Sequence, residues 1–376
     1  MRKLISFLII LFVADWVISI SSAAETAGYL SVNGPCNLEF PKDHGPHPGY
    51  RTEWWYYTGN LRAESGEGYG FQLTFFRRQI SPPADRQNWP QPTSAWRTQQ
   101  VYLAHSAISD ITAKKHLQAE QVSRQALNMA GANQTENTTT IFLKNWSAHI
   151  DPNQHRVKVN SDGFSYELTL TPQKAPVPHG IGGYSLKGSA AQRASCYYSF
   201  TRISAAGKLA IGENMVAVKG SAWMDHEYST ALLEPGLQGW DWFSLQLSDQ
   251  TEVMAFVLRK KKGGVGSASS ATDIDRLGQN QHIRKHEFRV TVGNTWKSPH
   301  SKAVYPAGWR LQVFPSLLDL TIKPNLADQE LRTTGSTGVI YWDGSVSIEG
   351  TRAGQPVVGQ GYVELTGYDK TFDAPM

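Results

Sequence analysis

The sequence predicts an all-β protein built from two consecutive domains. Most segments after the N-terminal leader alternate in polarity or are rich in β-branched and aromatic residues, and Gly, Pro, Asn and Ser separate them, as is typical of strands joined by turns. The chain has 376 residues, enough for two domains, and its 11% aromatic content suits β-sheets with large interiors. The clearest strand segments are residues 69–76, 157–159, 164–170, 196–203 and 253–258.

The N-terminus has the pattern of a cleavable signal peptide over residues 1–24. Two basic residues precede an apolar run at 4–13, and small residues at 22–24 precede Glu25. Asp15 interrupts the apolar stretch and leaves it short of a full membrane span, so a retained anchor is the weaker alternative. We therefore expect a periplasmic or secreted protein with no stable membrane span after processing.

Cys36 and Cys196 are the only cysteines of the chain. In an exported protein, a disulfide between them is chemically permitted and would tie the N-terminal arm to a strand.

The motif at residues 43–61 is the most informative of the chain. Two prolines exclude a helix at its start, so a loop leads into a strand. Alternation places Glu53, Trp55 and Tyr57 on one strand face, which we expect to be a pocket wall. The alternative is that the aromatic residues simply fill a β core.

Glu53 is the unusual member of this face. A carboxylate among tryptophans either pairs with Arg51 or Arg62, or is held in an apolar site with a raised pKa.

Two segments that follow, a polar one at 114–129 and a Pro-rich one at 80–97, are expected to be a short helix and a long loop of the kind that lids a pocket.

A second group of acids and indoles lies at residues 220–228 and 239–243. Alternation would put Trp223, Asp225 and Glu227 on one face of a strand. Two carboxyl groups held close together push their pKa values apart, and one of them can then carry a proton near neutral pH. The alternative is a strand end with solvated charges.

An internal repeat supports the division into two domains. Residues 55–61 leading to 70–77 resemble residues 242–247 leading to 253–259, and Gly220–Asp225 is echoed by Gly359–Glu364. We place the first domain at 25–228 and the second at 229–376.

Composition and motifs exclude several classes of function. The formal net charge of +4 is small and dispersed, so no nucleic-acid partner is expected. The basic run at 259–262 adjoins a glycine-rich stretch and is interpreted as a solvated hairpin tip, with contact to an anionic surface as the alternative. No phosphate-binding glycine loop and no Gly-x-Ser-x-Gly motif is found.

Metal binding is a separate possibility. Several histidines, namely His44, His47, His105, His179 and His226, can in principle converge with Asp225 or Glu227. None of them has His-Glu-x-x-His or paired-cysteine spacing, so we expect neither a metal nor another cofactor.

The two motifs, together with residues 341–346 and 359–368, resemble the hydroxyneurosporene synthase (carotenoid 1,2-hydratase) superfamily, and most of all its exported AttH-like, lipocalin-like branch. The resemblance runs from about residue 40 to residue 368. It implies two tandem lipocalin-like antiparallel β-barrels with a ligand cavity near their junction. It also implies water addition to an isoprenoid double bond as the family's defined chemistry, while a related fungal branch looks like pericyclase and cyclisation catalysts.

We expect one cavity between the barrels, lined by Glu53, Trp55, Tyr57, Asp225, His226, Glu227, Trp240 and Asp241. In the catalytic hypothesis, Asp225 or Glu227 donates a proton and His226 orients or relays it. Glu53 then positions water or a substrate hydroxyl. The candidate ligand-binding residues are Trp55, Tyr57, Trp223, Trp240, Asp241, His44 and His105.

Two classes of function remain. The first is an enzyme that protonates a double bond of a lipophilic, isoprenoid or lipid-like molecule and thereby hydrates or isomerises it. The second is a non-catalytic binder or carrier of a hydrophobic small molecule. A secreted hydrolase is a looser third class, because no nucleophile has a convincing set of partners.

Overall fold

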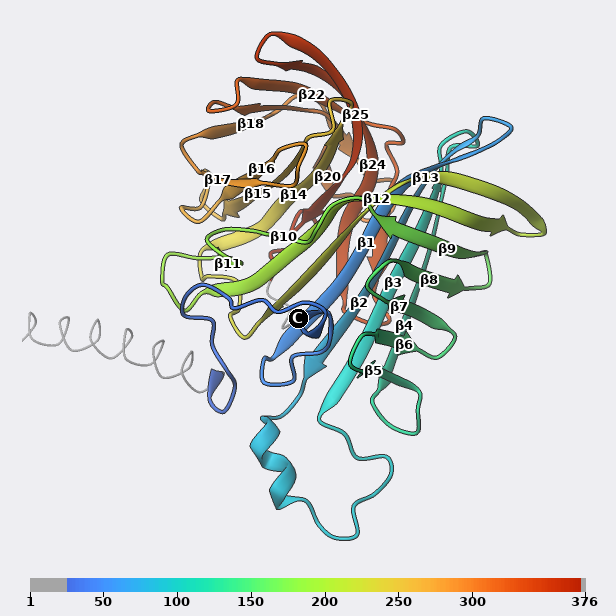
Figure 1. The fold of residues 1–376 in the computed structure, drawn as a ribbon, viewed down its shortest axis with the longest axis vertical. Helices are drawn as coiled ribbons and strands as arrows, with labels where there is room; N and C mark the ends of the chain where they lie inside the picture. The colour runs from blue at the N-terminus through green and yellow to red at the C-terminus, as the bar shows by residue number, and fades with distance from the viewer. Residues whose placement is uncertain (1–25, 373–376) are drawn as a thin grey trace, which may run out of the picture.

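The computed structural model describes residues 26–372, so the predicted signal peptide at 1–24 lies outside the described residues. Figure 1 shows two strongly curved antiparallel sheets, the first coloured blue to yellow-green and the second yellow to red. Each sheet curls into a nearly closed barrel, as predicted. The helical elements of these residues are two 3-10 turns, η1 (Lys42–His44) and η2 (Pro83–Asn88). Within the same residues, no helix has the length and apolar character needed to span a membrane.

The first barrel is a 13-stranded sheet. Its strands are β1 (Thr52–Ala63), β2 (Gly68–Gln79), β3 (Gln100–Asp110), β4 (Lys115–Arg124), β5 (Ala130–Gln134), β6 (Thr139–Leu143), β7 (Trp146–Ile150), β8 (His155–Asn160), β9 (Phe164–Pro172), β10 (Val177–Pro178), β11 (Tyr184–Leu186), β12 (Ala194–Ile211) and β13 (Asn214–Ser229). The opening strand β1 pairs with both β2 and the closing strand β13, and β3 and β4 approach β5 and β6 at the far side.

The second barrel is a 10-stranded sheet in which β14 pairs with both β15 and the closing strand β25. Its strands are β14 (Leu237–Leu247), β15 (Glu252–Lys260), β16 (Ser270–Ile274), β17 (Asn280–Arg284), β18 (Phe288–Val292), β21 (Trp309–Val313), β22 (Leu318–Pro324), β23 (Glu330–Thr333), β24 (Val339–Arg352) and β25 (Gln355–Thr366). A separate hairpin is formed by β19 (Thr295–Lys297) and β20 (Val304–Pro306). The predicted domain boundary at 228/229 lies at the end of β13.

The interior of each barrel is filled with side chains. In the first barrel, one face of β1 and β2 contributes Trp55, Tyr57, Leu61, Leu73 and Phe75 to a single buried cluster. The second barrel has its own cluster. Because side chains alternate along a strand, the opposite faces of the same strands point out of each barrel.

The outward faces of the two barrels meet and form a third buried cluster. It joins Tyr56 and Trp223 of the first barrel to Trp242, Phe256 and Tyr362 of the second. At the close approach of the sheets, a Cβ on Gly70 would lie 2.7 Å from the Tyr362 hydroxyl and 2.9 Å from Ser345 Cβ, so any larger residue there would have to displace these side chains. This junction of outward faces positions the candidate site.

The two halves of the internal repeat have the same strand arrangement. Each half begins with a hairpin, and the first strand of that hairpin pairs with the last strand of the half. Asp225 of β13 lies opposite Tyr56 of β1, and Glu364 of β25 lies opposite Trp242 of β14. Tyr56, and not Trp55 as the aligned repeat had it, is thus the structural counterpart of Trp242, since both belong to the cluster between the barrels, and Asp225 and Glu364 are equivalent positions.

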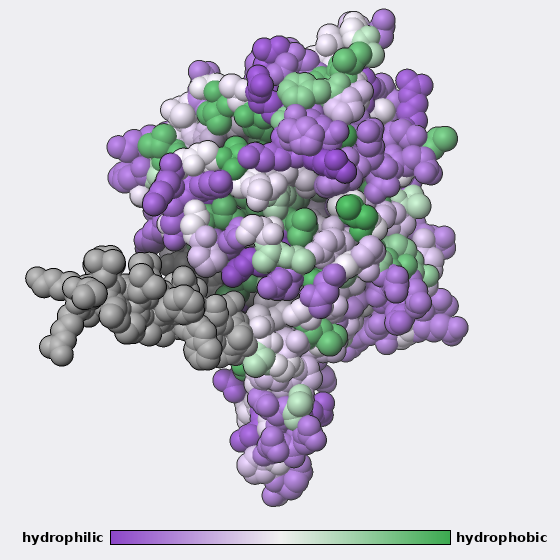
Figure 2. Space-filling model, turned by 90° about the vertical axis from the view of Figure 1, so that its left-hand side faces the viewer, coloured by the Kyte–Doolittle hydropathy of each residue, from purple (hydrophilic) through white to green (hydrophobic). Residues whose placement is uncertain are grey.

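The loop and helix predictions were wrong in part. Residues 114–129 contain the strand β4, not a helix, because this polar segment pairs with β3 while its side chains remain half-exposed. The loop 80–99 projects from the lower end of the first barrel in Figures 1 and 2, where its surface is mainly hydrophilic. It contributes no residue to the pocket described below, so it is no lid for that pocket.

Two smaller predictions concern covalent and charged contacts. The predicted disulfide between Cys36 and Cys196 is present, with a Cα–Cα distance of 5.9 Å. Residues 260–262 form an exposed hairpin tip, but Arg259 is withdrawn from it because its guanidinium pairs with Asp241 at 2.8 Å.

Candidate functional site

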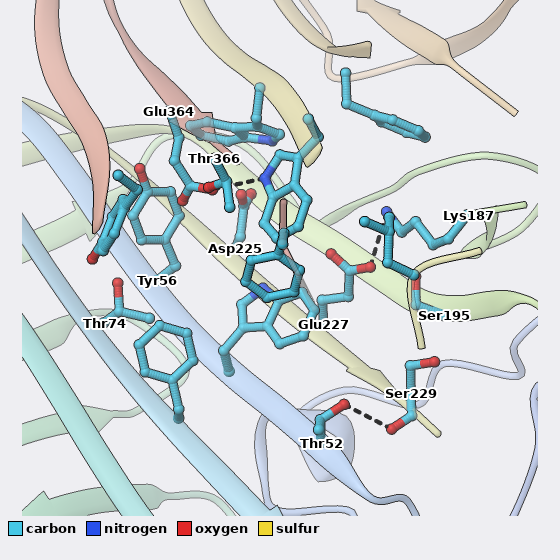
Figure 3. Close-up of a pocket in the computed structure, with 18 of the residues that line it drawn as sticks. Thr52, Tyr56, Thr74, Lys187, Ser195, Asp225, Glu227, Ser229, Glu364 and Thr366 are labelled. Carbon is cyan, nitrogen blue, oxygen red and sulfur yellow. Dashed lines mark hydrogen bonds and ion pairs between the residues drawn. The ribbon is translucent and has the colours of Figure 1, made fainter. Parts of the chain in front are cut away.

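A pocket of about 170 Å³, which we call the inter-barrel pocket, lies between the outward faces of the barrels (Figure 3). β1, β2, β3, β12 and β13 supply one wall, and β14, β15, β24 and β25 supply the other. Nine of its 25 lining residues are aromatic, namely Trp54, Tyr56, Phe76, Tyr197, Trp240, Trp242, Phe256, Tyr341 and Phe372. Few charged groups face this apolar space, and they are Lys187, Asp225, Glu227 and Glu364.

Asp225 is the most unusual of these groups. Its carboxylate accepts hydrogen bonds from the Ser199 hydroxyl, from Trp223 Nε1 at 2.6 Å and from the Tyr197 hydroxyl at 3.0 Å. Burial raises the pKa of Asp225 to about 7, although these three donors oppose the shift and Glu227 adds to it. Both protonation states of this carboxyl group are thus accessible near neutral pH.

Glu227 faces the same pocket but has a cationic partner. Lys187 Nζ lies 2.9 Å from Glu227 Oε1 and over the rings of Tyr197 and Phe256, at 4.9 and 4.4 Å from their centroids. Because Lys187 is next to this carboxylate, Glu227 is the weaker candidate for a proton donor.

A second acidic group lies on the opposite wall, and the sequence did not identify its members as site residues. Asp343 of β24 and Glu364 of β25 are direct cross-strand neighbours. The Tyr56 hydroxyl donates to Asp343 at 2.8 Å, and Trp240 Nε1 donates to Glu364 at 2.7 Å. The repeat alone was the signal for this site, since it aligns Asp225 with Glu364.

The remaining candidates divide between lining and non-lining positions. Trp240 and His105 line the pocket. The ring nitrogens of His105 lie 2.9 Å from the Tyr341 and Ser336 hydroxyls, and burial lowers its pKa to about 3, so it is neutral. Trp223 is no lining residue but holds Asp225, and Asp241 is turned away toward Arg259.

The prediction that Glu53, Trp55 and Tyr57 line the cavity was wrong. These side chains point into the first barrel, whereas Trp54 and Tyr56 of the same strand face the pocket. The period of two was correct, but the face was not, because both faces of β1 are buried and both carry aromatic residues. The period-two core of β2, with Leu73 and Phe75, was the signal that could have assigned the faces.

Glu53 belongs to an ion-pair network inside the first barrel, which we call the interior network. Its carboxylate lies 2.7 Å from Arg77 Nε and 2.8 Å from His226 Nε2. Neither Arg51 nor Arg62 is this partner, since the β1–β2 register places Arg77 directly opposite Glu53. Burial alone would raise the pKa of Glu53, but Arg77 and His47 hold it well below its usual range.

His226 is part of the same network and not of the pocket. It follows Asp225 in an extended strand, so its ring projects to the other face, where Nδ1 lies 3.0 Å from the Tyr198 hydroxyl. The predicted relay from His226 to Asp225 or Glu227 is therefore excluded by geometry. His44 is likewise inside the barrel, with Nδ1 2.7 Å from the Tyr198 hydroxyl.

His47, Glu53 and His226 place one ligand atom each within 4.8 Å of one another, as in a three-residue metal site. His47 also contacts Asp43 at 2.9 Å, and although burial lowers the pKa of His47, Glu53 and Asp43 raise it to about 9. The protonated imidazole of His47 and the Arg77 guanidinium already neutralise the charges of Asp43 and Glu53. The arrangement fits an ion-pair network better than a metal site.

The fold and the pocket define a protein of two lipocalin-like barrels with an apolar pocket between their outward faces. Residues 31–368 match the AttH-like family, and the chain belongs to this family. A structure assigned to AttH from Nitrosomonas europaea is 33% identical, with a TM-score of 0.79, and the match covers 90% of this chain and 99% of that chain.

Two more distant structures share the fold. Kievitone hydratase from Nectria haematococca is 15% identical with a TM-score of 0.66, and the match covers 91% of this chain and 96% of that chain. CghA is 16% identical with a TM-score of 0.54, over 92% and 95% of the two chains. No curated protein matches this chain in sequence.

Proposed function

We propose that the inter-barrel pocket binds a hydrophobic, unsaturated small molecule and that Asp225 protonates one of its double bonds. The observation that carries this proposal is a buried carboxyl group that faces an aromatic cavity without a cationic partner among the described residues, and burial raises the pKa of this group to about 7. The shared fold with kievitone hydratase supports hydration as the type of reaction, by analogy of fold only.

The chemistry requires few groups. The proton of Asp225 is transferred to one alkene carbon, and the π electrons form the new C–H bond and leave a carbocation on the neighbouring carbon. The faces of Trp54, Trp240 and Trp242 stabilise this positive charge. Attack by a water oxygen on the cation and loss of a proton from that water complete a hydration. Loss of a neighbouring C–H proton instead completes an isomerisation.

The second candidate function is a non-catalytic carrier of a lipophilic molecule. One observation favours it, since three of the four acidic residues predicted for the cavity, Glu53, Glu227 and Asp241, are held in ion pairs. Asp225 and Glu364 lack such partners among residues 26–372, which favours the enzyme.

The test compares Asp225→Asn with the wild type on kievitone and on an acyclic carotene, with incorporation of oxygen from isotopically labelled water as the readout. We expect the variant to lose about a hundredfold or more in rate, because it lacks the general acid. Its affinity for the neutral dye N-phenylnaphthylamine should stay within about tenfold, because the apolar walls are intact.

The matched control is Asp162→Asn, which makes the same chemical change in an exposed turn between β8 and β9. It should retain the wild-type rate. Dye binding without turnover of either compound by the wild type would favour the carrier.

We also propose that the protein is exported after removal of residues 1–24. The basic, apolar and small-residue progression of the leader supports export, and so does the disulfide between Cys36 and Cys196, since structural disulfides persist in oxidising compartments.

A further inference from the structure

Asp343 and Glu364 form a pair of carboxyl groups in the wall of the inter-barrel pocket. The two residues are directly opposite each other on β24 and β25, where the Asp343 side chain is buried and the Glu364 side chain is half-buried at the pocket. Among the described residues, neither forms an ion pair. Their partners are neutral donors, namely the Tyr56 hydroxyl, Trp240 Nε1 and the Thr366 hydroxyl.

Two ionised carboxylates side by side in an apolar wall, without a cation, are strongly disfavoured. Burial and the mutual repulsion of like charges both favour a neutral form, so one proton is retained by the pair. Asp343 Oδ2 is buried and has no hydrogen-bond partner. An unpaired carboxylate oxygen is costly there, and a proton on the Asp343 carboxyl group reduces this cost.

The two members of the pair face different surroundings. Glu364 lines the cavity, whereas Asp343 is behind it and reaches the cavity only through the Tyr56 hydroxyl. Figure 3 shows Glu364 and Asp225 directed into the same space, from different barrels. The accessible member of the pair therefore shares the cavity with the proposed proton donor.

We propose that Asp343 and Glu364 share one proton and that Glu364, when ionised, accepts the proton of the attacking water in the reaction started by Asp225. This inference rests on the proposed function. Asp225 gives its proton to carbon, the water oxygen forms the C–O bond, and the released proton goes to Glu364. Asp225 ends ionised and Glu364 ends protonated, and exchange with solvent restores both groups. Asp343 is a positioning residue that holds the shared proton.

The electrostatic surroundings of Glu364 agree with this role. Burial raises the pKa of Glu364 to about 7 and Glu227 adds to the shift, although the hydrogen bonds from Trp240 and Thr366 oppose it. Burial and the neighbouring Glu364 raise the pKa of Asp343 as well. The titratable and charged groups on the strands around the pair are Tyr56 of β1, His105 of β3, Asp225 and Glu227 of β13, Tyr341 of β24 and Tyr362 of β25, with Lys187 paired to Glu227.

The first experiment needs no substrate. Infrared spectroscopy detects the carbonyl stretch of protonated carboxyl groups, and labelling the glutamate carboxyl carbons with a heavy isotope moves the Glu364 band away from aspartate bands. In the wild type, we expect protonated glutamate and aspartate signals that persist above the ordinary carboxyl titration range. Asp343→Asn should shift the glutamate titration to lower pH, because the repulsion is removed. An unchanged glutamate titration would overturn the shared proton.

The second experiment uses the compound that the wild type turns over. Glu364→Gln should reduce kcat by about a hundredfold with little change in KM, because an amide cannot accept the proton. Asp343→Asn should retain more activity and move the ascending limb of the kcat/KM pH profile to lower pH. The control Glu349→Gln changes an exposed glutamate of β24 that pairs with Lys323, and it should behave as the wild type.

The outcomes separate the two proposals. If Asp225→Asn abolishes turnover while Glu364→Gln does not, only the role of Glu364 fails. If Asp225→Asn leaves turnover unchanged, the proposed function fails, and the infrared titration still decides whether the proton is shared. Should Glu364→Gln fail to fold, the isotope-labelled wild type alone provides this decision.

Discussion

Replacing Arg77 with methionine should destabilise the protein by about 3–5 kcal/mol, the usual cost of removing one partner of a buried ion pair. The Arg77 and Glu53 side chains have no exposed surface, and their closest atoms are 2.7 Å apart. The Arg77 guanidinium also donates to the backbone carbonyls of His47 and Tyr50, at 2.8 and 3.0 Å. These carbonyls would lose a charged donor, while His47 would still compensate part of the Glu53 charge.

The assay is equilibrium unfolding in urea, followed by tryptophan fluorescence and far-UV circular dichroism. The control Arg62→Met makes the same change at the exposed end of the neighbouring strand β1, and we expect a loss within about 0.5 kcal/mol. Domains of this kind have only about 5–15 kcal/mol of stability, so the difference between the variants is large on this scale.

A double variant separates lost charge compensation from lost packing. Glu53→Gln combined with Arg77→Met removes the uncompensated anion, so the double variant should be more stable than Arg77→Met alone. If Arg77→Met were as mild as Arg62→Met, the interior network would not stabilise the first barrel, contrary to what its burial and geometry imply.

Four further predictions follow from particular contacts. The pKa of Asp225 is about 7 in the folded protein, above its unfolded value of about 3.9. The stability of the wild type should therefore fall relative to that of Asp225→Asn as the pH rises from about 4 to about 7, by about 1.4 kcal/mol for each pH step of about one. Urea midpoints of the two proteins that stay parallel across this range would contradict the prediction. The denatured, unreduced protein should show no free thiol, and reduction of Cys36–Cys196 should lower the free energy of unfolding by about 2–5 kcal/mol; two titratable thiols would exclude the bond. Trp54→Ala should weaken N-phenylnaphthylamine binding by about tenfold, or about 1.4 kcal/mol, in a fluorescence titration, whereas Trp96→Ala in the projecting loop should not; equal effects would place the dye outside the pocket. N-terminal sequencing of protein from the cell envelope should begin near residue 25, and an intact initiating methionine would rule out cleavage.

Much of the architecture was predictable from the sequence, because strand patterns are local. Alternating polarity, the prolines before β1 and the glycine-rich turns follow from backbone sterics and burial within a few residues. The polar segment that forms β4 was the exception. A strand that stays half-exposed on both faces lacks the alternation that identifies strands, so its polarity was mistaken for a helix.

The candidate site was predictable only in part. Asp225, Glu227 and Trp240 were placed at the junction of the barrels, and they do line the pocket there. Asp343 and Glu364 lie in two segments that carry the family resemblance, and Glu364 also ends the repeat, but their pairing depends on the β24–β25 register. Register depends on partners far apart in the chain, and no short window of sequence contains both members.

The sequence by itself determined that this protein is all-β, that it consists of two similar halves, and that acids and indoles recur in both halves. Composition and the alternation of polarity along a strand are properties of the chain alone. Only the tertiary structure decided what each face of β1 meets. Alternation separates Glu53 from Trp54, but it does not say which side chain enters the barrel when both faces are buried. Because the second barrel packs against the outward face of β1, Trp54 and Tyr56 on that face line the pocket. Glu53 on the other face pairs with Arg77 inside the first barrel.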